Sequence, residues 1–327
     1  MSRETLRERH VVMQTALTPI VWGTTYFVAV EFLPTGRPML AAAVRALPVG
    51  LVFVGLGRTR PSGVWWWRAT VLGALNIGLF FGLLFVAAFR LAGGVAATIG
   101  AVQPLIAGGL AAVVVGERFS SRTALGGGLG VVGVALLVLR ANVHLDTLGV
   151  LAALGATTSM AAGVVLTKKW GRPVGLIAFT GWQLTAGGIL IVPVMLATEG
   201  LPNVLTGRNI AGFVWLSIVG TGLAYANWFR GIQTLSVTTA STLGLLSPLV
   251  ATFVGWFALD QTLSPSQFAG ALLVIAAVCS RSMPGRRSSH RRQSAPLDAP
   301  TTPNDSTDST IELGASLIQQ NQTNKGH

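Results

Sequence analysis

Apolar runs, each about 17–25 residues long, follow one another along almost the whole chain, with short polar connections between them. A run of this length crosses a hydrocarbon core about 30 Å thick as an α-helix. We predict ten such spans, at 11–30, 38–56, 69–89, 93–115, 123–139, 147–166, 176–197, 210–229, 236–258 and 265–281. The chain is therefore predicted to be an all-α integral membrane protein.

Composition supports this class, because only 10% of the 327 residues are charged and the mean hydropathy is +0.63. Many of the 40 glycines lie inside the runs, where small residues let membrane helices approach closely. The single cysteine, Cys279, provides no disulfide framework and no cysteine cluster for a metal. We expect no metal and no cofactor.

The two ends of the chain differ from the runs. Residues 1–10 are basic, and the apolar run after them is of full spanning length without a convincing small-x-small cleavage site, so we interpret it as the first span rather than a signal peptide. Residues 283–327 are polar and rich in Pro, Ser, Thr and Arg, which predicts a disordered tail.

Lys and Arg concentrate in alternate connections, and short connections rich in these residues stay on the cytoplasmic side. With the N-terminus inside, the outer connections hold only Arg37, Arg90, Arg140 and Arg208, and all other connecting cations lie inside. We therefore predict a multi-pass cell-membrane protein with both termini cytoplasmic. Topology and anionic headgroups account for the net charge of +12, and no aromatic-interleaved basic patch indicates nucleic-acid binding.

One phrase occurs twice: IGAVQPLIAG at 99–108 and LGLLSPLVAT at 243–252. A shift of 144 residues superposes them, and shifts of 137–138 align LTPIVWGTTYF with LGATTSMAAGV, and AAVRALPVG with TGWQLTAGG. The repeat unit is five spans, so residues 11–139 and 140–282 form two copies. Because five is odd, the second copy is inverted in the membrane. The loops fit, since GERFSSR inside aligns with DQTLSPS outside, which lacks both arginines.

The repeated phrase predicts a break in two helices. Proline has no N–H and its ring crowds the carbonyl four residues back, which pairs Pro104 with Gly100 and Pro248 with Gly244. We expect a kink with a freed carbonyl at each, buried in protein or facing a watery cavity. Paired breaks in inverted halves indicate a substrate site near the membrane midplane.

These features together resemble the EamA family of the drug/metabolite transporter superfamily. The resemblance covers roughly residues 11–282 and rests on WGTTYF, on AAVRALPVG, on VAATIGAVQPLIAGGLAAVVVGERFS and on TTASTLGLLSPLVATFVGWFALDQTLS. It implies two inverted five-helix repeats around a central cavity that opens alternately to either side, and export of small metabolites, amino acids prominent among them, or of toxic compounds. The chain departs from the pattern where Glu117 aligns with Gln261 and Trp22 with Ser159.

Polar residues inside spans are costly and are the first candidates for the transport path. Arg45, midway along its span, is interpreted either as an anchor for a substrate carboxylate or as a pin between helices. Amides and aromatic side chains suit a small amphipathic ligand, although each also suits interhelical contacts or an interfacial belt. The full set of candidate cavity residues is Trp22, Thr25, Tyr26, Arg45, Asn76, Phe80, Gln103, Trp182, Gln183, Tyr225, Asn227 and Trp228.

The predicted function is secondary transport, with multidrug efflux or lipid-carrier flipping as alternatives in the same superfamily. No Asp or Glu lies in the middle of a span, so a carboxylate proton relay is not supported, and no Walker motif indicates ATP use. Glu117, at a span end beside Arg118, is interpreted as positioning a loop or forming a surface ion pair. The histidines lie outside the spans, which disfavours an intramembrane enzyme, and no pore filter is visible. The predicted partners are a small-molecule substrate and the bilayer, and no feature separates a monomer from a homodimer.

Overall fold

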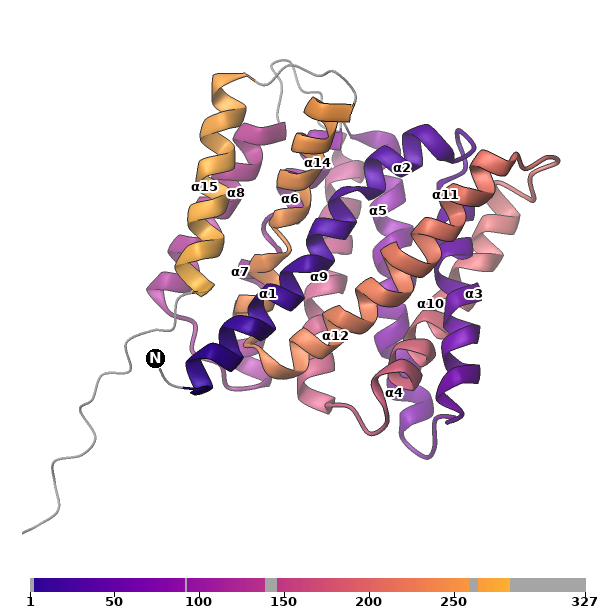
Figure 1. Ribbon diagram of the computed structural model, residues 1–327, viewed down its shortest axis with the longest axis horizontal. Helices are drawn as coiled ribbons and strands as arrows, with labels where there is room; N and C mark the ends of the chain where they lie inside the picture. Colours follow the sequence, from indigo (N-terminus) through magenta and orange to yellow (C-terminus); the bar gives the residue numbers. More distant parts are fainter. Residues whose placement is uncertain (1–2, 92, 139–145, 259–263, 283–327) are drawn as a thin grey trace, which may run out of the picture. The chain divides into compact units, whose positions relative to one another are not determined.

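The chain folds into helices, with no strand, wherever the computed structural model describes it, namely residues 3–91, 93–138, 146–258 and 264–282 (Figure 1). Met1–Pro284 form one compact unit. The predicted disordered tail lies outside the described residues. Helical structure throughout satisfies the backbone N–H and C=O groups within each segment, which the hydrocarbon core of a membrane requires.

Eight helices among the described residues are long and apolar enough to cross a membrane, and each coincides with a predicted span. Four of them are unbroken: α3 (Pro38–Gly57), α8 (Ser121–Val138), α9 (Thr147–Trp170) and α10 (Leu176–Thr198). The first predicted span corresponds to α1 (Arg3–Gly23) and α2 (Thr25–Phe32), and the last to α15 (Pro265–Ser282). These two do not meet the length and composition of the other eight, because the first turns of α1 are charged and the apolar part of α15 is shorter.

The two Gly-x-x-x-Pro phrases break their helices, as predicted. The chain turns between α6 (Gly93–Gly100) and α7 (Gln103–Val114), and again between α13 (Val237–Leu243) and α14 (Leu246–Ala258). The prediction of a free carbonyl is wrong for Gly244, because its oxygen accepts a hydrogen bond from the N–H of Ser247 at 3.0 Å. Because Pro248 has no N–H to offer this oxygen, the turn tightens by one residue and uses Ser247 instead.

Two further helices contain π-helical turns that the sequence did not predict. The turn η1 (Ala74–Gly78) joins α4 (Trp65–Gly73) to α5 (Leu79–Arg90), and η2 (Ile218–Leu223) joins α11 (Gly207–Ser217) to α12 (Ala224–Thr234). The turns begin 144 residues apart, the same separation as Pro104 and Pro248. Such turns are rare in proteins, and those that occur are often found at functional sites.

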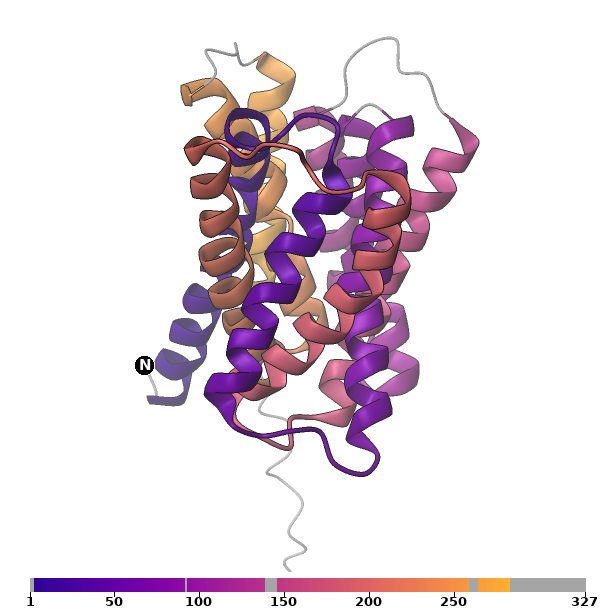
Figure 2. The same cartoon turned by 90° about the vertical axis from the view of Figure 1, so that its right-hand side faces the viewer.

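Small residues set the contacts between the long helices. Helix α3 packs along α10, and α8 along α15 (Figures 1 and 2). A Cβ atom on Gly50 would lie 2.6 Å from the backbone N of Thr185, and one on Gly188 would lie 2.8 Å from Cβ of Leu47. Glycine is thus required at these crossings, where the two backbones meet.

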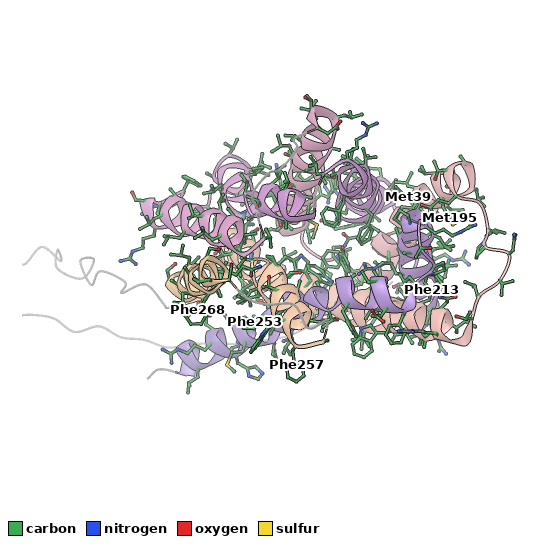
Figure 3. All side chains as sticks on the ribbon, turned by 90° about the horizontal axis from the view of Figure 1, so that it is seen from above. Met39, Met195, Phe213, Phe253, Phe257 and Phe268 are labelled. Carbon is green, nitrogen blue, oxygen red and sulfur yellow. The ribbon has the colours of Figure 1, made fainter. Side chains whose placement is uncertain are left out.

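Large apolar side chains lie on the outside of the helices as well as in the core. Met39, Met195 and Phe213 are buried between α3, α10 and α11, whereas Phe253, Phe257 and Phe268 lie on the outer side of α14 and α15 (Figure 3). Phe257 is 86% exposed. An apolar exterior of this kind fits lipid as the surrounding solvent.

Candidate functional site

A cavity of about 480 Å³ lies where the broken helices meet. Its lining includes both Gly-x-x-x-Pro breaks, with Gly100 and Pro104 from one and Gly244 and Pro248 from the other. Its size falls in the range of small-molecule sites, roughly 300–1,000 Å³. The predicted candidates that line it are Trp22, Thr25, Arg45, Phe80, Gln103, Tyr225 and Trp228.

The other candidates lie elsewhere. Asn76 and Gln183 are fully buried beside each other, with Asn76 Nδ2 donating to Gln183 Oε1 at 2.9 Å. Trp182 donates from Nε1 to the carbonyl of Thr59, and Asn227 donates to Thr18 Oγ1. These four residues join helices to one another or, for Trp182, to the connection after α3, and they do not line the cavity. The side chain of Tyr26 lies outside the described part of the chain.

Arg45 lies at the cavity and joins two helical segments. Its Nε donates to Thr221 Oγ1 at 2.8 Å and its Nη2 donates to the carbonyl of Gly220 at 3.2 Å, so it holds η2 as a pin. Its guanidinium lies 5.1 Å from the centre of the Phe81 ring, and the residue also lines the cavity. No carboxylate among the described residues forms an ion pair with it.

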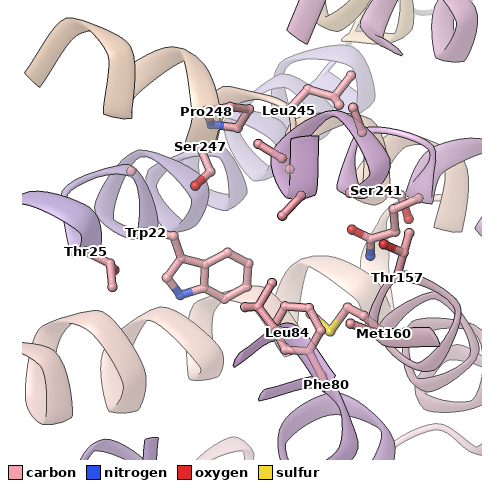
Figure 4. A pocket seen from close by; sticks show the side chains of 18 of the residues that line it. Trp22, Thr25, Phe80, Leu84, Thr157, Met160, Ser241, Leu245, Ser247 and Pro248 are labelled. Carbon is pink, nitrogen blue, oxygen red and sulfur yellow. The ribbon is translucent and has the colours of Figure 1, made fainter. Parts of the chain in front are cut away.

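Trp22 contacts the same π turn, η2, as Arg45 does. Its Nε1 donates to the same Gly220 carbonyl at 3.1 Å, and its ring packs on Tyr225 and Trp228, with ring centres 5.1 Å and 5.3 Å away. In a π turn the carbonyl pairs with the N–H five residues on, and the irregular ladder lets the Gly220 oxygen accept from side chains. Figure 4 shows the Trp22 indole directed toward Leu84 and Phe80 across the cavity.

A matching set of contacts surrounds η1. Gln183, which aligns with Arg45, accepts from Asn76 of η1, and Ser159, which aligns with Trp22, donates to the carbonyl of Leu75 at 2.9 Å. The departure at Ser159 therefore preserves a contact with a π-turn carbonyl while removing the ring. Of the aligned residues Trp22 and Ser159, only Trp22 has an aromatic ring, so the two halves of the chain differ chemically at this position.

Three polar atoms that belong to cavity-lining residues are buried, out of contact with the open part of the cavity, and have no hydrogen-bond partner among the described residues. They are Gln103 Nε2, Trp228 Nε1 and Ser241 Oγ. A buried polar group without a partner is costly, and a side-chain shift that brings these atoms to a ligand acceptor removes this cost. The polar lining thus combines the Arg45 guanidinium with hydroxyl groups and the Gln103 amide, which can both donate and accept.

Sequence reasoning missed many lining residues, and those with a hydroxyl or a thioether are Thr157, Met160, Ser241 and Ser247. The repeat carried a signal for Ser247, because it aligns with Gln103 and both precede the proline of their phrase. The others carry none, since single hydroxyls and methionines in apolar helices are common. Among the described residues, no group of three His, Cys, Asp or Glu side chains could hold a metal ion.

Glu117 positions a helix end. Its carboxylate oxygens accept from the N–H of Val237, the first residue of α13, at 2.8 Å and 3.1 Å. The nearby Lys168 donates to the carbonyls of Gln233 and Leu235 at the end of α12. The acid at a helix start and the base at a helix end both complement the helix dipoles. The aligned residue Gln261 lies outside the described residues.

Residues 11–139 and 147–282 each match the EamA-like transporter family. Protein PecM of Dickeya dadantii (strain 3937) is 47% identical over 262 residues, which cover 80% of this chain and 88% of PecM. The chloroplastic WAT1-related protein At3g02690 of Arabidopsis thaliana is 30% identical over 273 residues, covering 79% of this chain and 66% of that protein.

Two further comparisons agree. The uncharacterized inner membrane transporter YedA of Escherichia coli (strain K12) is 25% identical over 268 residues, covering 79% of this chain and 86% of YedA. A solved crystal structure superposes with a TM-score of 0.71 at 19% identity, covering 83% of this chain and 97% of that one. At that identity the superposition establishes a shared fold and nothing more.

Proposed function

The chain belongs to the EamA-like transporter family of the drug/metabolite transporter superfamily, and on this premise we propose that it is a secondary transporter that exports small metabolites, with amino acids among the candidates. Transport proceeds by alternating access around the central cavity. The observation that carries the proposal is the cavity itself, which is lined by both Gly-x-x-x-Pro breaks and by Arg45. Helix breaks beside a polar cavity are the usual surroundings of a substrate site in secondary transporters.

We further propose ten transmembrane helices in two inverted five-helix repeats, with both termini cytoplasmic. Aligned helices pack on each other, α3 on α10 and α8 on α15, as a two-fold relationship between the halves requires. The π turns share the separation of the proline phrases, and Arg45 and Gln183 each contact the turn of the other half. These pairings support the inverted repeat, and the distribution of Lys and Arg supports the orientation.

The breaks give the proposed mechanism its hinges. Pro104 and Pro248 interrupt the hydrogen-bond ladder of two helices at the cavity, so that each half-helix can tilt without breaking a full ladder. Among the described residues that line the cavity there is no Asp, Glu or His. This supports a facilitator or exchanger rather than a carrier driven through a carboxylate proton relay.

One observation favours the alternative of efflux of lipophilic compounds or flipping of a lipid carrier. A second hollow of about 430 Å³ lies between α2 and α11, with Phe27, Phe32 and Trp215 in its lining. Thr24 in this lining stands at the break between α1 and α2, next to Thr25, which lines the central cavity. An acyl chain or other lipophilic group lying in this hollow would be adjacent to the cavity.

The proposed function is tested by thermal stabilisation of the purified protein with a panel of amino acids, sugars and lipophilic cations, followed by flux into proteoliposomes. Stabilisation and flux with a small polar metabolite support the exporter. Stabilisation by lipophilic cations or lipids alone supports efflux of lipophilic compounds or flipping of a lipid carrier instead. Absence of flux for every stabilising compound would refute transport.

A further inference from the structure

We propose that the central cavity selects small organic anions that carry an apolar ring or chain, and that it discriminates against substrates with an ammonium group. The inference rests on the proposed function and narrows its substrate class. It separates carboxylates from the amino acids that otherwise stand as candidates, since an amino acid adds an ammonium group to the same carboxylate.

The charge of the cavity is the first argument. Arg45 is the only cavity-lining side chain among the described residues that is charged at neutral pH. It is 7% exposed, and its partners are a hydroxyl and a carbonyl rather than a carboxylate. A buried cation with neutral partners attracts an anion strongly and repels a second cation, because screening within the protein is weaker than in bulk water.

The acids that could balance an ammonium group are engaged elsewhere. Glu31 pairs with Arg208 at 2.7 Å, and Asp146 accepts from the N–H of Gly149 at 2.7 Å. Glu199 accepts from the N–H groups of Met39 and Leu40 at the start of α3. Together with Glu117 on Val237, these carboxylates all lie at helix ends, and none lines the cavity.

The unpaired polar atoms are the second argument. An indole N–H can only donate, and the Nε1 atom of Trp228, a cavity-lining residue, is buried without an acceptor, so it reaches a ligand oxygen when neighbouring side chains shift. Gln103 Nε2 is a second unpaired donor. The Gly220 carbonyl, an acceptor beside Arg45, is already taken by Trp22 and Arg45. Carboxylate or carbonyl oxygens of a ligand satisfy these donors, whereas an ammonium group leaves them unpaired and finds only neutral hydroxyl and amide oxygens in the lining.

The apolar wall of the cavity suits a ligand with a ring or chain, but its aromatic side chains could also favour an ammonium group. Trp22, Phe80, Leu84 and Met160 line one part of the cavity and suit an apolar ring (Figure 4). Aromatic faces also attract ammonium groups. However, the Arg45 guanidinium already lies over the Phe81 ring, and its charge opposes a second cation in the same cavity.

The test uses four probes that share a phenyl ring: 3-phenylpropionate, L-phenylalanine, 2-phenylethylamine and 3-phenylpropan-1-ol. Binding to the purified full-length protein is measured by isothermal titration calorimetry. We expect 3-phenylpropionate to bind about tenfold or more tightly than phenylalanine, and phenylethylamine to bind weakest. In Arg45→Gln the affinity for 3-phenylpropionate falls to that of the alcohol, while the matched exposed substitution Arg208→Gln leaves it unchanged.

A second variant separates binding from folding. Trp228→Phe keeps the ring and the Arg45 charge but removes the unpaired donor, and it should weaken 3-phenylpropionate severalfold more than the alcohol. Three results overturn the anion proposal: phenylalanine binding as tightly as 3-phenylpropionate or more tightly, phenylethylamine binding as tightly as phenylalanine or more tightly, or binding of none of the four probes. So does an equal loss for all four probes in Arg45→Gln, which identifies a pin alone. Transport itself is judged separately by the flux of the panel compounds.

Discussion

Trp22 and Arg45 donate to the same backbone oxygen, the carbonyl of Gly220, from distances of 3.1 Å and 3.2 Å. The two donors come from α1 and α3, and the acceptor lies in the π turn η2 at the edge of the cavity. Three helical segments are therefore joined at one atom. A movement that opens this side of the cavity must release the contact or carry all three segments together.

Trp22→Phe removes the indole donor and keeps an aromatic ring, and we expect it to lower stability by about 0.5–1.5 kcal/mol, the net value of one hydrogen bond. Thermal unfolding in detergent measures the change. Trp66→Phe is the control, because Trp66 is exposed on α4. A Trp22→Phe protein as stable as the control protein would show that the contact with Gly220 is energetically unimportant.

The double substitution of Pro104 and Pro248 by Ala restores two backbone N–H groups at the breaks. We expect normal membrane insertion and a folded protein, with flux of the stabilising panel compound reduced severalfold because the hinges are lost. Proteoliposome uptake measures the flux, and Pro61→Ala, in the polar connection between α3 and α4, is the control. Unchanged uptake in the double variant would remove the hinge role from both prolines.

Gly50→Ala should destabilise the protein by about 1–3 kcal/mol, because the added methyl group meets the backbone of α10. Gly55→Ala, one and a half turns further along α3, has open space at its Cβ position and should be neutral or stabilising. Chemical denaturation of both proteins gives the comparison. Similar stability of the two variants would mean that α3 and α10 do not cross closely at Gly50.

Glu117→Gln should weaken the start of α13 by about 0.5–2 kcal/mol, since a charged acceptor at a helix N-terminus becomes neutral. The unfolding temperature should fall, while Glu8→Gln, at an exposed site in α1, should leave it unchanged. Loss of flux without any loss of stability would instead assign Glu117 a part in transport.

The spans and the proline breaks were predictable because each follows from a strong local constraint. A spanning helix must be long and apolar, and a proline cannot donate to its ladder, so Pro104 and Pro248 mark their breaks in the sequence. The π turns at Ala74 and Ile218 have no comparable signature, since an extra residue in a helical turn depends on the packing around it.

The candidate site was predictable only in part, for a related reason. Arg45 was identifiable because a charge within a span must face protein or water, and it lines the cavity. Asn76 and Gln183 carried the same polar signal, yet they lie in a separate buried contact. Which face of a helix meets the cavity depends on how the helix is rotated, and in this helix on the extra residue in η1. Both depend on packing against other helices, so the local sequence does not predict them.

The most direct test of the transport path is the accessibility of Ser247, which lines the cavity on α14. Replacement of Cys279, the only cysteine, by Ser permits a single Ser247→Cys label site. The protein is treated with a membrane-impermeant maleimide in right-side-out and in inside-out vesicles. Alternating access predicts labelling from both sides, with the stabilising panel compound changing the two rates in opposite directions or protecting both. Labelling from one side alone, with and without that compound, would contradict transport through this cavity.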